Sequence, residues 1–223
     1  MKILLINPNS DELVTNSMKL LAASYIEEGI SIDCIDIPDA PKFIGSYYDH
    51  FLISKGLVNI IKENNDRYDG FIIGCHGDPN LELLKEITVK PLVGIGEVSM
   101  KVATLLGDSF SVIMASSDLI PNKKVMINNY GLDRYFNSVR VANVENEKKI
   151  NEELVEACEN AVYLDKSEVL VLGCAAFSGK KSIIERTLNV PVVDGVSISI
   201  GVLIGIIKAK LSISKVGRYK LKN

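Results

Sequence analysis

The sequence predicts an α/β fold made of two similar three-layer lobes, each built on a parallel sheet. Short apolar runs alternate with longer segments of helical spacing along the chain. Several of these runs are apolar throughout, which is typical of strands covered by helices on both faces. A strand motif that ends in Gly-Cys also occurs twice, with its two cysteines 99 residues apart. Two lobes related by a pseudo-twofold axis account for all three observations.

Eight apolar runs are the candidate strands: Lys2–Ile6, Ser31–Ile35, Gly70–Gly74, Leu92–Ile95, Phe110–Met114, Ser138–Val141, Val169–Gly173 and Val192–Val193. The clearest helical pattern runs from Asn146 to Asp165. There the apolar side chains recur at steps of about 3.6 residues, at Ile150, Leu154, Cys158, Ala161 and Val162. We therefore expect strands and helices to alternate, as they do in a parallel sheet.

The repeat around the two cysteines predicts where the active site lies. Tyr68–Cys75 resembles Lys166–Cys174, and Pro91 and Pro191 follow the two cysteines at similar distances. Because parallel α/β sheets present ligands at the carboxyl ends of their strands, each thiol is expected at such an end. If the lobes face each other, the two thiols meet, and the cleft between the lobes is the predicted active site.

The expected domain organisation follows from the same repeat. The first lobe is predicted to span residues 1–98 and the second residues 99–199. We expect the C-terminal segment, about 200–223, to pack back on the first lobe.

Composition predicts a cytoplasmic protein that binds a small molecule rather than nucleic acid or a membrane. The chain has 25 basic and 28 acidic residues, a net charge of −3, so it offers no basic footprint. The longest uncharged stretch, Gly195–Ile207, has thirteen residues, whereas a membrane span needs about 20. The first apolar run ends at Asn7-Pro8-Asn9, which is too short for a signal-peptide core.

The inventory of reactive side chains is small, and it predicts neither a metal nor a cofactor. The chain has four Cys, two His and no Trp, with no C-x-x-C pair, which excludes a three-histidine site and a zinc ribbon. Gly94–Ser99 lacks the third glycine of a dinucleotide loop, and Gly173–Gly179 encloses five residues, one more than a phosphate loop. Thiols are therefore the chemistry to explain.

Two opposed thiols suit the movement of a proton from one face of a carbon to the other. Such a reaction needs an acid and a base, one on each face, so one cysteine begins as thiolate and the other as thiol. Expected helix starts follow both cysteines, at Gly77-Asp78-Pro79 and at Ser178-Gly179. A helix N-terminus lowers a thiol pKa, and its N–H groups hold an enolate oxygen.

Each of these residues also has a structural interpretation. A single cysteine that ends an apolar strand is more often part of the core, and only the matched positions of Cys75 and Cys174 favour catalysis. We expect Cys34 and Cys158 to be core residues. His76 either tunes Cys75, contacts the ligand or has a structural role. His50 lies in a tyrosine-rich stretch and is expected to pack or to line an edge.

At this point the residues resemble the hydantoin/allantoin racemase branch of the aspartate/glutamate racemase superfamily. The similarity runs nearly end to end. Its motifs are Ile6–Ser10, Gly74–Leu81, Pro91–Glu97, Leu172–Ala175, Pro191–Gly195 and the tail Ser214–Tyr219. The resemblance implies two α/β lobes, homo-oligomers and a cofactor-independent mechanism in which Cys75 and Cys174 are the catalytic pair.

The resemblance also implies contacts to the substrate, although several positions depart from the family pattern. The expected substrate-binding residues are Asn9, Ile44, His76, Ser116, Ala175 and Phe177. Met114-Ala115 stand where the family usually has a Thr-Thr pair, Asp118 where an Arg is common, and Ala176-Phe177 where Gly-Met is frequent. In the first lobe, Pro41–Gly45 replaces a Ser-Ile-Glu run.

The leading prediction is a racemase or epimerase of a cyclic ureide, a 5-substituted hydantoin or allantoin. The backbone amides after each cysteine, with Asn9 and Ser116, are expected to hold the ring oxygens, and Ile44 and Phe177 to shape the substituent pocket. One alternative keeps the fold and changes the substrate, as in an aspartate-type racemase or a maleate-isomerase-like enzyme. Another is non-enzymatic: a ureide-binding or thiol-based redox-sensing protein.

Overall fold

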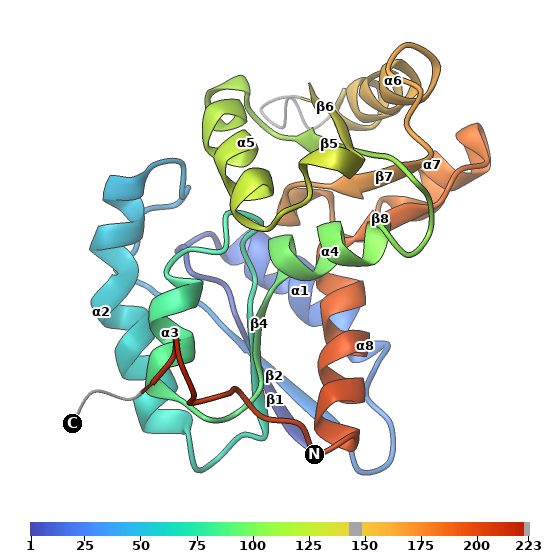
Figure 1. Ribbon diagram of the computed structural model, residues 1–223. Helices are drawn as coiled ribbons and strands as arrows, with labels where there is room; N and C mark the ends of the chain where they lie inside the picture. The colour runs from blue at the N-terminus through green and yellow to red at the C-terminus, as the bar shows by residue number, and fades with distance from the viewer. Residues whose placement is uncertain (143–148, 221–223) are drawn as a thin grey trace. The chain divides into compact units, whose positions relative to one another are not determined.

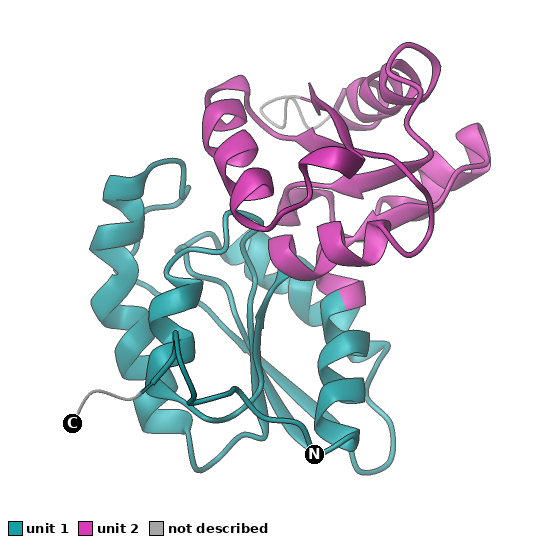
Figure 2. Cartoon of the chain, in the orientation of Figure 1, with its two compact units in different colours: residues 1–95, 199–223 teal, residues 96–198 magenta. Residues whose placement is uncertain are grey.

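The computed structural model describes residues 1–142 and 149–220, which form two compact units. Unit 1 consists of Met1–Ile95 with Ser199–Asn223, and unit 2 of Gly96–Ile198. Figure 2 distinguishes the two units by colour. The chain passes between the units next to residues 95 and 198, whereas the repeat predicts boundaries after residues 98 and 199.

Unit 1 contains a four-stranded parallel sheet with the strand order β2-β1-β3-β4. Its strands are β1 (Lys2–Ile6), β2 (Ser31–Ile35), β3 (Gly70–Ile73) and β4 (Leu92–Gly94). Unit 2 repeats this order as β6-β5-β7-β8, again with parallel neighbours. These strands are β5 (Phe110–Met114), β6 (Phe136–Val141), β7 (Val169–Leu172) and β8 (Val192–Asp194). The predicted α/β fold with two parallel sheets is confirmed.

Helices separate the strands, as expected for parallel crossovers (Figure 1). The α-helices are α1 (Glu12–Ala23), α2 (Tyr47–Asn64), α3 (Leu81–Ile87), α4 (Ile95–Ala103), α5 (Ile120–Asn129), α6 (Ile150–Tyr163), α7 (Lys181–Leu188) and α8 (Gly195–Lys208). Three 3₁₀ helices occur among the described residues: η1 (Ser117–Leu119), η2 (Asp133–Tyr135) and η3 (Ala175–Phe177). The helix predicted from Asn146 to Asp165 is α6, and its first predicted turn falls partly outside the described residues.

Each sheet is covered on both faces, which gives each unit three layers. In unit 1, α2 and α3 bury their apolar faces against β1 and β3 in one core cluster. Met18 of α1 and Leu203 of α8 lie against the sheet glycines Gly74 and Gly70 on the other face. In unit 2, α6 and α7 pack on one face of the sheet and α4 and α5 on the other. Since β1, β3, β5 and β7 have helices on both sides, their residues are apolar nearly throughout.

The C-terminal segment runs along α3 of unit 1. The Ile213 N–H donates to the Val89 carbonyl at 3.1 Å. The Lys215 ammonium donates to the carbonyl at the end of α3, that of Lys85, at 2.6 Å, and Arg218 lies 3.3 Å from Glu82. Within the described residues, no helix is long and apolar enough to cross a membrane.

Candidate active site

Cys75 and Cys174 occupy equivalent places in the two units. Each is the second residue beyond a central strand, β3 for Cys75 and β7 for Cys174. The glycine before each cysteine donates its N–H to the neighbouring strand, Gly74 to Ile6 and Gly173 to Ile113, both with an N···O distance of 2.7 Å. The repeat seen in the sequence is therefore a repeat of hydrogen-bond register, and each thiol follows the carboxyl end of its strand.

The glycine before each cysteine stands where there is little space for a side chain, and the space is more restricted at Gly173 than at Gly74. A Cβ at Gly74 would lie 2.9 Å from the Met18 sulfur, and a Cβ at Gly173 would lie 2.6 Å from Val112 Cγ1 and 2.8 Å from the Ile113 oxygen. At Gly173 the obstacles are a branched side chain and a backbone oxygen in a close-packed interior, so a larger residue would displace the following cysteine. At Gly74 the nearest obstacle is the flexible end of Met18, which can move more easily.

Asn9 and Ser116 are also equivalent, since each lies three residues after the carbonyl that accepts the glycine N–H. The Asn9 Oδ1 accepts hydrogen bonds from the Asn7 amide and the Asp11 N–H, both at 2.8 Å. The Ser116 Oγ accepts from the Asp118 N–H at 3.3 Å. Both oxygens thus shape their own loops, and the Asn9 amide hydrogens and the Ser116 hydroxyl hydrogen are the groups suited to donate to a ligand.

The loop after Cys75 is a tight turn fixed to α2. The Asp78 N–H donates to the Cys75 carbonyl at 2.9 Å. Asp78 and Asn80 have φ angles of 45° and 59°, in the left-handed region that non-glycine residues rarely adopt. The Asn80 amide donates to the backbone carbonyl of His50 at 2.6 Å. The loop conformation is therefore held by its surroundings, as is typical of functional loops.

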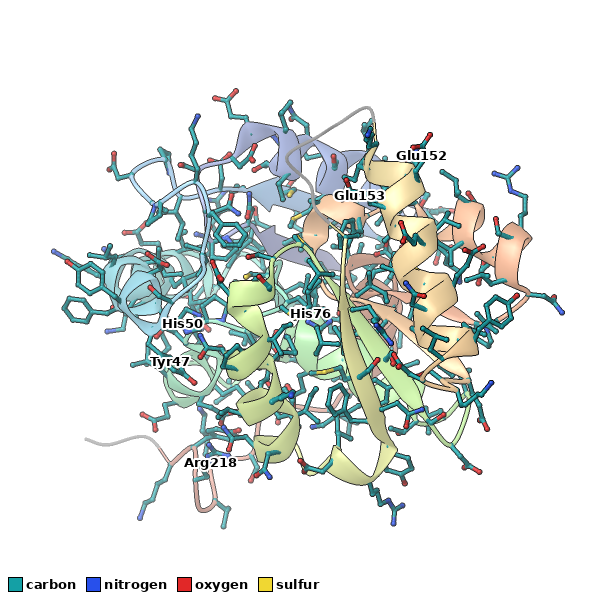
Figure 3. The ribbon with its side chains drawn as sticks, turned by 90° about the horizontal axis from the view of Figure 1, so that it is seen from above. Tyr47, His50, His76, Glu152, Glu153 and Arg218 are labelled. Carbon is teal, nitrogen blue, oxygen red and sulfur yellow. The ribbon has the colours of Figure 1, made fainter. Side chains whose placement is uncertain are left out.

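His50 lies beside this loop, although the sequence predicts only a packing or edge role for it. A capping box between Ser46 and Asp49 fixes the start of α2, and His50 follows in its first turn, with its ring centroid 5.7 Å from that of Tyr47 (Figure 3). A Cβ added to Gly77 would be 3.7 Å from both the Cys75 Sγ and the His50 Nε2. The thiol and the imidazole therefore flank the same small gap.

Burial lowers the pKa of His50 below its ordinary value of 6.5, against the opposing effect of the Asp49 carboxylate. The imidazole beside Cys75 is therefore neutral at pH 7.

The loop after Cys174 has a different construction. The sequence predicts a helix start at Ser178-Gly179, whereas the structure has the 3₁₀ helix η3 directly after Cys174 and begins α7 at Lys181. Cys174 is the N-cap residue of η3, and the Phe177 N–H donates to its carbonyl at 3.0 Å. The cysteine thus lies at the positive end of a short turn.

Burial raises the pKa of the Cys174 thiol above its ordinary value of 9.0. Two groups of unit 2 oppose this rise: the Ala176 N–H, which hydrogen-bonds to the sulfur, and the ammonium of Lys123. Lys123 is buried on α5, where its Nζ lies 3.1 Å from the Met126 sulfur. Cys174 is therefore a protonated thiol at neutral pH whose thiolate has two stabilising groups in place.

The other two cysteines lack this environment. Cys158 is buried in the core of unit 2, as predicted, and burial raises its pKa to about 12. Cys34, expected to be a core residue, is instead half-buried on the edge strand β2, and its thiol donates to the Thr15 carbonyl at 3.8 Å. Burial raises the pKa of Cys34 to about 11, with an opposing effect of Lys19. Neither thiol ionises near neutral pH.

Several predicted contact residues lie in the interior. Ile44 belongs to the core of unit 1, Phe177 is fully buried in the core of unit 2, and His76 and Ala175 are buried as well. Ile44 and Phe177 therefore fill space behind the loops, and direct contact of any of the four with a substrate stays a prediction. Among the described residues, no group of three or more His, Cys, Asp or Glu side chains is arranged to hold a metal ion.

Sequence reasoning missed two residues beside the cysteines, His50 and Lys123. His50 stands 25 residues before Cys75, and Lys123 stands 51 residues before Cys174. The Ser46 and Asp49 capping box was a usable signal for the start of α2. For Lys123, only its place on the inner face of a helical pattern distinguished it from its exposed neighbour Lys124.

A family model described as Asp/Glu/Hydantoin racemase matches residues 3–203 of the chain. The chain belongs to this family. A hydantoin racemase from Pseudomonas sp. (strain NS671) is 31% identical over 227 residues, covering 99% of this chain and 91% of that protein. A hydantoin racemase from Paenarthrobacter aurescens is 28% identical, covering 99% and 97%. Membership of the Asp/Glu/Hydantoin racemase family makes the chain an isomerase of the racemase type.

Solved structures of racemases share the fold of this chain. The allantoin racemase from Pseudomonas fluorescens has a TM-score of 0.94 at 25% identity, covering 100% of this chain and 97% of that chain. The allantoin racemase from Klebsiella pneumoniae has a TM-score of 0.94 at 23% identity, covering 100% and 94%. The glutamate racemase RacE1 from Bacillus anthracis has a TM-score of 0.65 at 16% identity, covering 93% and 82%.

Proposed function

We propose that the chain racemises a cyclic ureide, a 5-substituted hydantoin or allantoin, with Cys75 and Cys174 as the two acid/base groups. The observation that carries the proposal is their equivalent position, two residues beyond a central strand in units of identical strand order. The hydantoin and allantoin racemases similar to this chain favour the substrate class.

The reaction moves one proton off the stereocentre and returns one to the opposite face. One thiolate removes the proton on its face and becomes a thiol, while the C–H electron pair passes into the adjacent carbonyl as an enolate. The other thiol then gives its proton to the opposite face and becomes a thiolate. The two cysteines exchange protonation states in each turnover, and no cofactor is consumed.

In this proposal Cys174 is the proton donor at the start of the cycle, and the electrostatics of unit 2 support that role. The raised pKa of Cys174 keeps the thiol protonated, and the two-base mechanism then requires Cys75 to supply the initial thiolate. After Cys174 has given up its proton, the Ala176 N–H and the Lys123 ammonium stabilise the thiolate that remains. The product then leaves, and the two cysteines return to their starting protonation states through exchange with solvent or by converting a molecule of the opposite enantiomer.

The developing enolate oxygen needs donors held in place before the reaction. The backbone N–H groups after each cysteine and the donor hydrogens of Asn9 and Ser116 supply them in this proposal. Homo-oligomers and a cytoplasmic location are part of the same proposal, since the family resemblance and the composition favour them.

The test is a screen in heavy water across hydantoins, allantoin and free amino acids, in which deuterium incorporation and loss of optical rotation are followed together. We expect both signals with a cyclic ureide and neither with the amino acids. Cys75→Ser and Cys174→Ser should each lower racemisation by about a thousandfold or more, since each removes one of two required groups. Racemisation at the native rate by either variant would falsify the two-base mechanism. Binding of a ureide with no deuterium incorporation would favour the non-enzymatic alternative.

A further inference from the structure

Two buried carboxylates, Asp78 and Asp194, connect the cysteine loops to the ends of the last strands. Asp78 is 7% exposed and Asp194 is 4% exposed. Carboxylates are rarely buried to this degree unless hydrogen bonds compensate the lost hydration. The groups that surround each buried carboxylate therefore show which segments of the chain it connects.

Asp194 ends β8 and reaches back to the Cys174 loop. Its Oδ1 accepts hydrogen bonds from the Val196 and Ser197 N–H groups, both at 3.0 Å, in the first turn of α8. Its Oδ2 accepts the Gly179 N–H, also at 3.0 Å. One carboxylate thus joins the strand end, the start of the next helix and the loop that begins at Cys174.

Asp78 makes the corresponding connection in unit 1 from the opposite side. It belongs to the Cys75 loop, and its carboxylate lies against the backbone of Gly94, the last residue of β4. A Cβ at Gly94 would be 2.1 Å from the Asp78 Oδ1 and 2.4 Å from its Cγ. Only glycine at position 94 leaves room for this carboxylate.

The sheet register shows that Gly94 and Asp194 are the same structural position. Gly94 pairs with Ile73, and Asp194 pairs with Leu172. Both partners lie two residues before the cysteine of their unit. In unit 1 the loop provides the carboxylate and the strand end is glycine, whereas in unit 2 the strand end provides the carboxylate and the loop has Gly179.

In both units a carboxylate thus connects the cysteine loop to the end of the last strand. The carboxylate belongs to the loop in unit 1 and to the strand in unit 2. If the carboxylates served only the fold, the repeat would be expected to retain the same residue at the same position. A different residue that makes the same link indicates that the geometry of the cysteine loop is what both units require. The link also reaches the places where the chain passes from one unit to the other, after residues 95 and 198.

We propose that Asp78 and Asp194 are positioning residues, each of which fixes one cysteine loop so that its thiol faces the substrate. The proposal rests on the two-cysteine function given above. Asp78 acts on Cys75 alone and Asp194 on Cys174 alone, so each carboxylate supports proton transfer at one face of the substrate. A displacement of a catalytic group by about 1 Å lowers rates by up to about a hundredfold.

Enantiomer-resolved exchange in heavy water tests this assignment with Asp78→Asn and Asp194→Asn. Forward and reverse racemisation rates are linked by an equilibrium constant of one, but the initial exchange rate of each pure enantiomer depends on the thiol that removes its proton. We expect each variant to slow the exchange of one enantiomer at least about tenfold more than that of the other, with opposite preferences in the two variants. The slowed enantiomer should be the one affected by Cys→Ser in the same unit.

Asp165→Asn is the matched control, because Asp165 is a carboxylate of unit 2 that pairs with Arg140 at 2.6 Å, away from the cysteine loops. This control should lower thermal stability and leave the exchange ratio of the two enantiomers unchanged. Equal slowing of both enantiomers by Asp78→Asn or Asp194→Asn would overturn the positioning role. If Cys75→Ser and Cys174→Ser racemise at the native rate, the proposed two-cysteine function fails. That result is distinguishable from failure of the positioning role, which is tested by the aspartate variants alone.

A second pair of variants, in which the carboxylate of unit 1 is moved from position 78 to position 94, tests the proposal if Asp78→Asn or Asp194→Asn folds poorly. Gly94→Asp alone places a carboxylate against Asp78 and should abolish exchange by Cys75. The double variant Asp78→Gly with Gly94→Asp rebuilds in unit 1 the arrangement of unit 2. The rate of exchange by Cys75 in the double variant should be at least about tenfold higher than in Gly94→Asp alone. No recovery in a folded double variant would contradict the proposal.

Discussion

The loops after Cys75 and Cys174 start from the same position on the same topology, yet they surround their thiols differently. The Cys75 loop contains two left-handed residues and lies beside the neutral imidazole of His50. The Cys174 loop is a 3₁₀ turn whose thiol has the Ala176 N–H and the Lys123 ammonium nearby. The repeat determines where the thiols stand, and the loops determine how each one handles a proton.

The largest expected effect concerns the glycines that bring each cysteine to the sheet edge. A Cβ at Gly173 would meet the Val112 methyl and a backbone oxygen, neither of which can move easily, whereas a Cβ at Gly74 would mainly meet the flexible end of Met18. We expect Gly173→Ala to lower the free energy of unfolding by about 3 kcal/mol and Gly74→Ala by about 1 kcal/mol. Urea titration measures both values. Equal losses would contradict the difference in packing.

The next largest effect is electrostatic and belongs to unit 2. Lys123→Met removes a cation that lowers the pKa of Cys174, so that pKa rises further. The pH profile of exchange from the enantiomer served by Cys174 should move to higher pH, and the rate at pH 8 should fall about tenfold. Lys124→Met, an exposed neighbour on α5, is the control and should leave the profile in place. An unshifted profile in Lys123→Met would remove Lys123 from the site.

A smaller effect is expected at His50 in unit 1. Since the imidazole is neutral at pH 7, His50→Gln keeps a hydrogen-bonding group and should slow exchange by Cys75 only about threefold. The substitution also has a stability signature. The pKa of His50 is lower in the folded than in the unfolded chain, so its contribution to stability is present above 6.5 and is lost as the pH falls through the folded pKa.

Stability curves of the native chain and of His50→Gln between pH 7 and pH 5 measure this signature. The native chain should lose more stability than the variant over that interval. Parallel curves would mean that His50 is solvated.

The smallest effect is expected at the two remaining cysteines. Cys34→Ser and Cys158→Ala should leave racemisation within about twofold of the native rate, because both thiols have raised pKa values and stand apart from the cysteine loops. In the native chain, iodoacetamide at pH 8 should label neither of them before the fold opens. Rapid alkylation of Cys34 or Cys158 at that pH would show that burial does not protect them.

Much of the fold could be predicted because the strand signals are local. The runs at β1, β2 and β5 match their predicted bounds. In β1 and β5 the residues are buried nearly throughout, which is typical of strands covered on both faces. The edge strand β6 begins at Phe136, two residues before its predicted start, because its alternating polar residues weaken the signal. The 3₁₀ turn after Cys174 could not be predicted, since short turns depend on packing beneath them.

The site was predictable only where the repeat marks it. Gly-Cys at two equivalent strand ends identifies Cys75 and Cys174 without any structure. His50, Lys123 and the exchanged carboxylates Asp78 and Asp194 depend on contacts between segments distant in the sequence. The sequence repeat does not reveal that Asp78 and Asp194 have corresponding roles, because it aligns Asp194 with Gly94 rather than with Asp78.

The most direct test of the account compares exchange from each pure enantiomer in Cys75→Ser and in Cys174→Ser. If the two thiols serve opposite faces, each variant should retain exchange without inversion from one enantiomer and lose exchange from the other. The retained enantiomer should differ between the two variants. Loss of exchange from the same enantiomer in both variants, or inversion at the native rate in either, would contradict a mechanism that divides the two faces between Cys75 and Cys174.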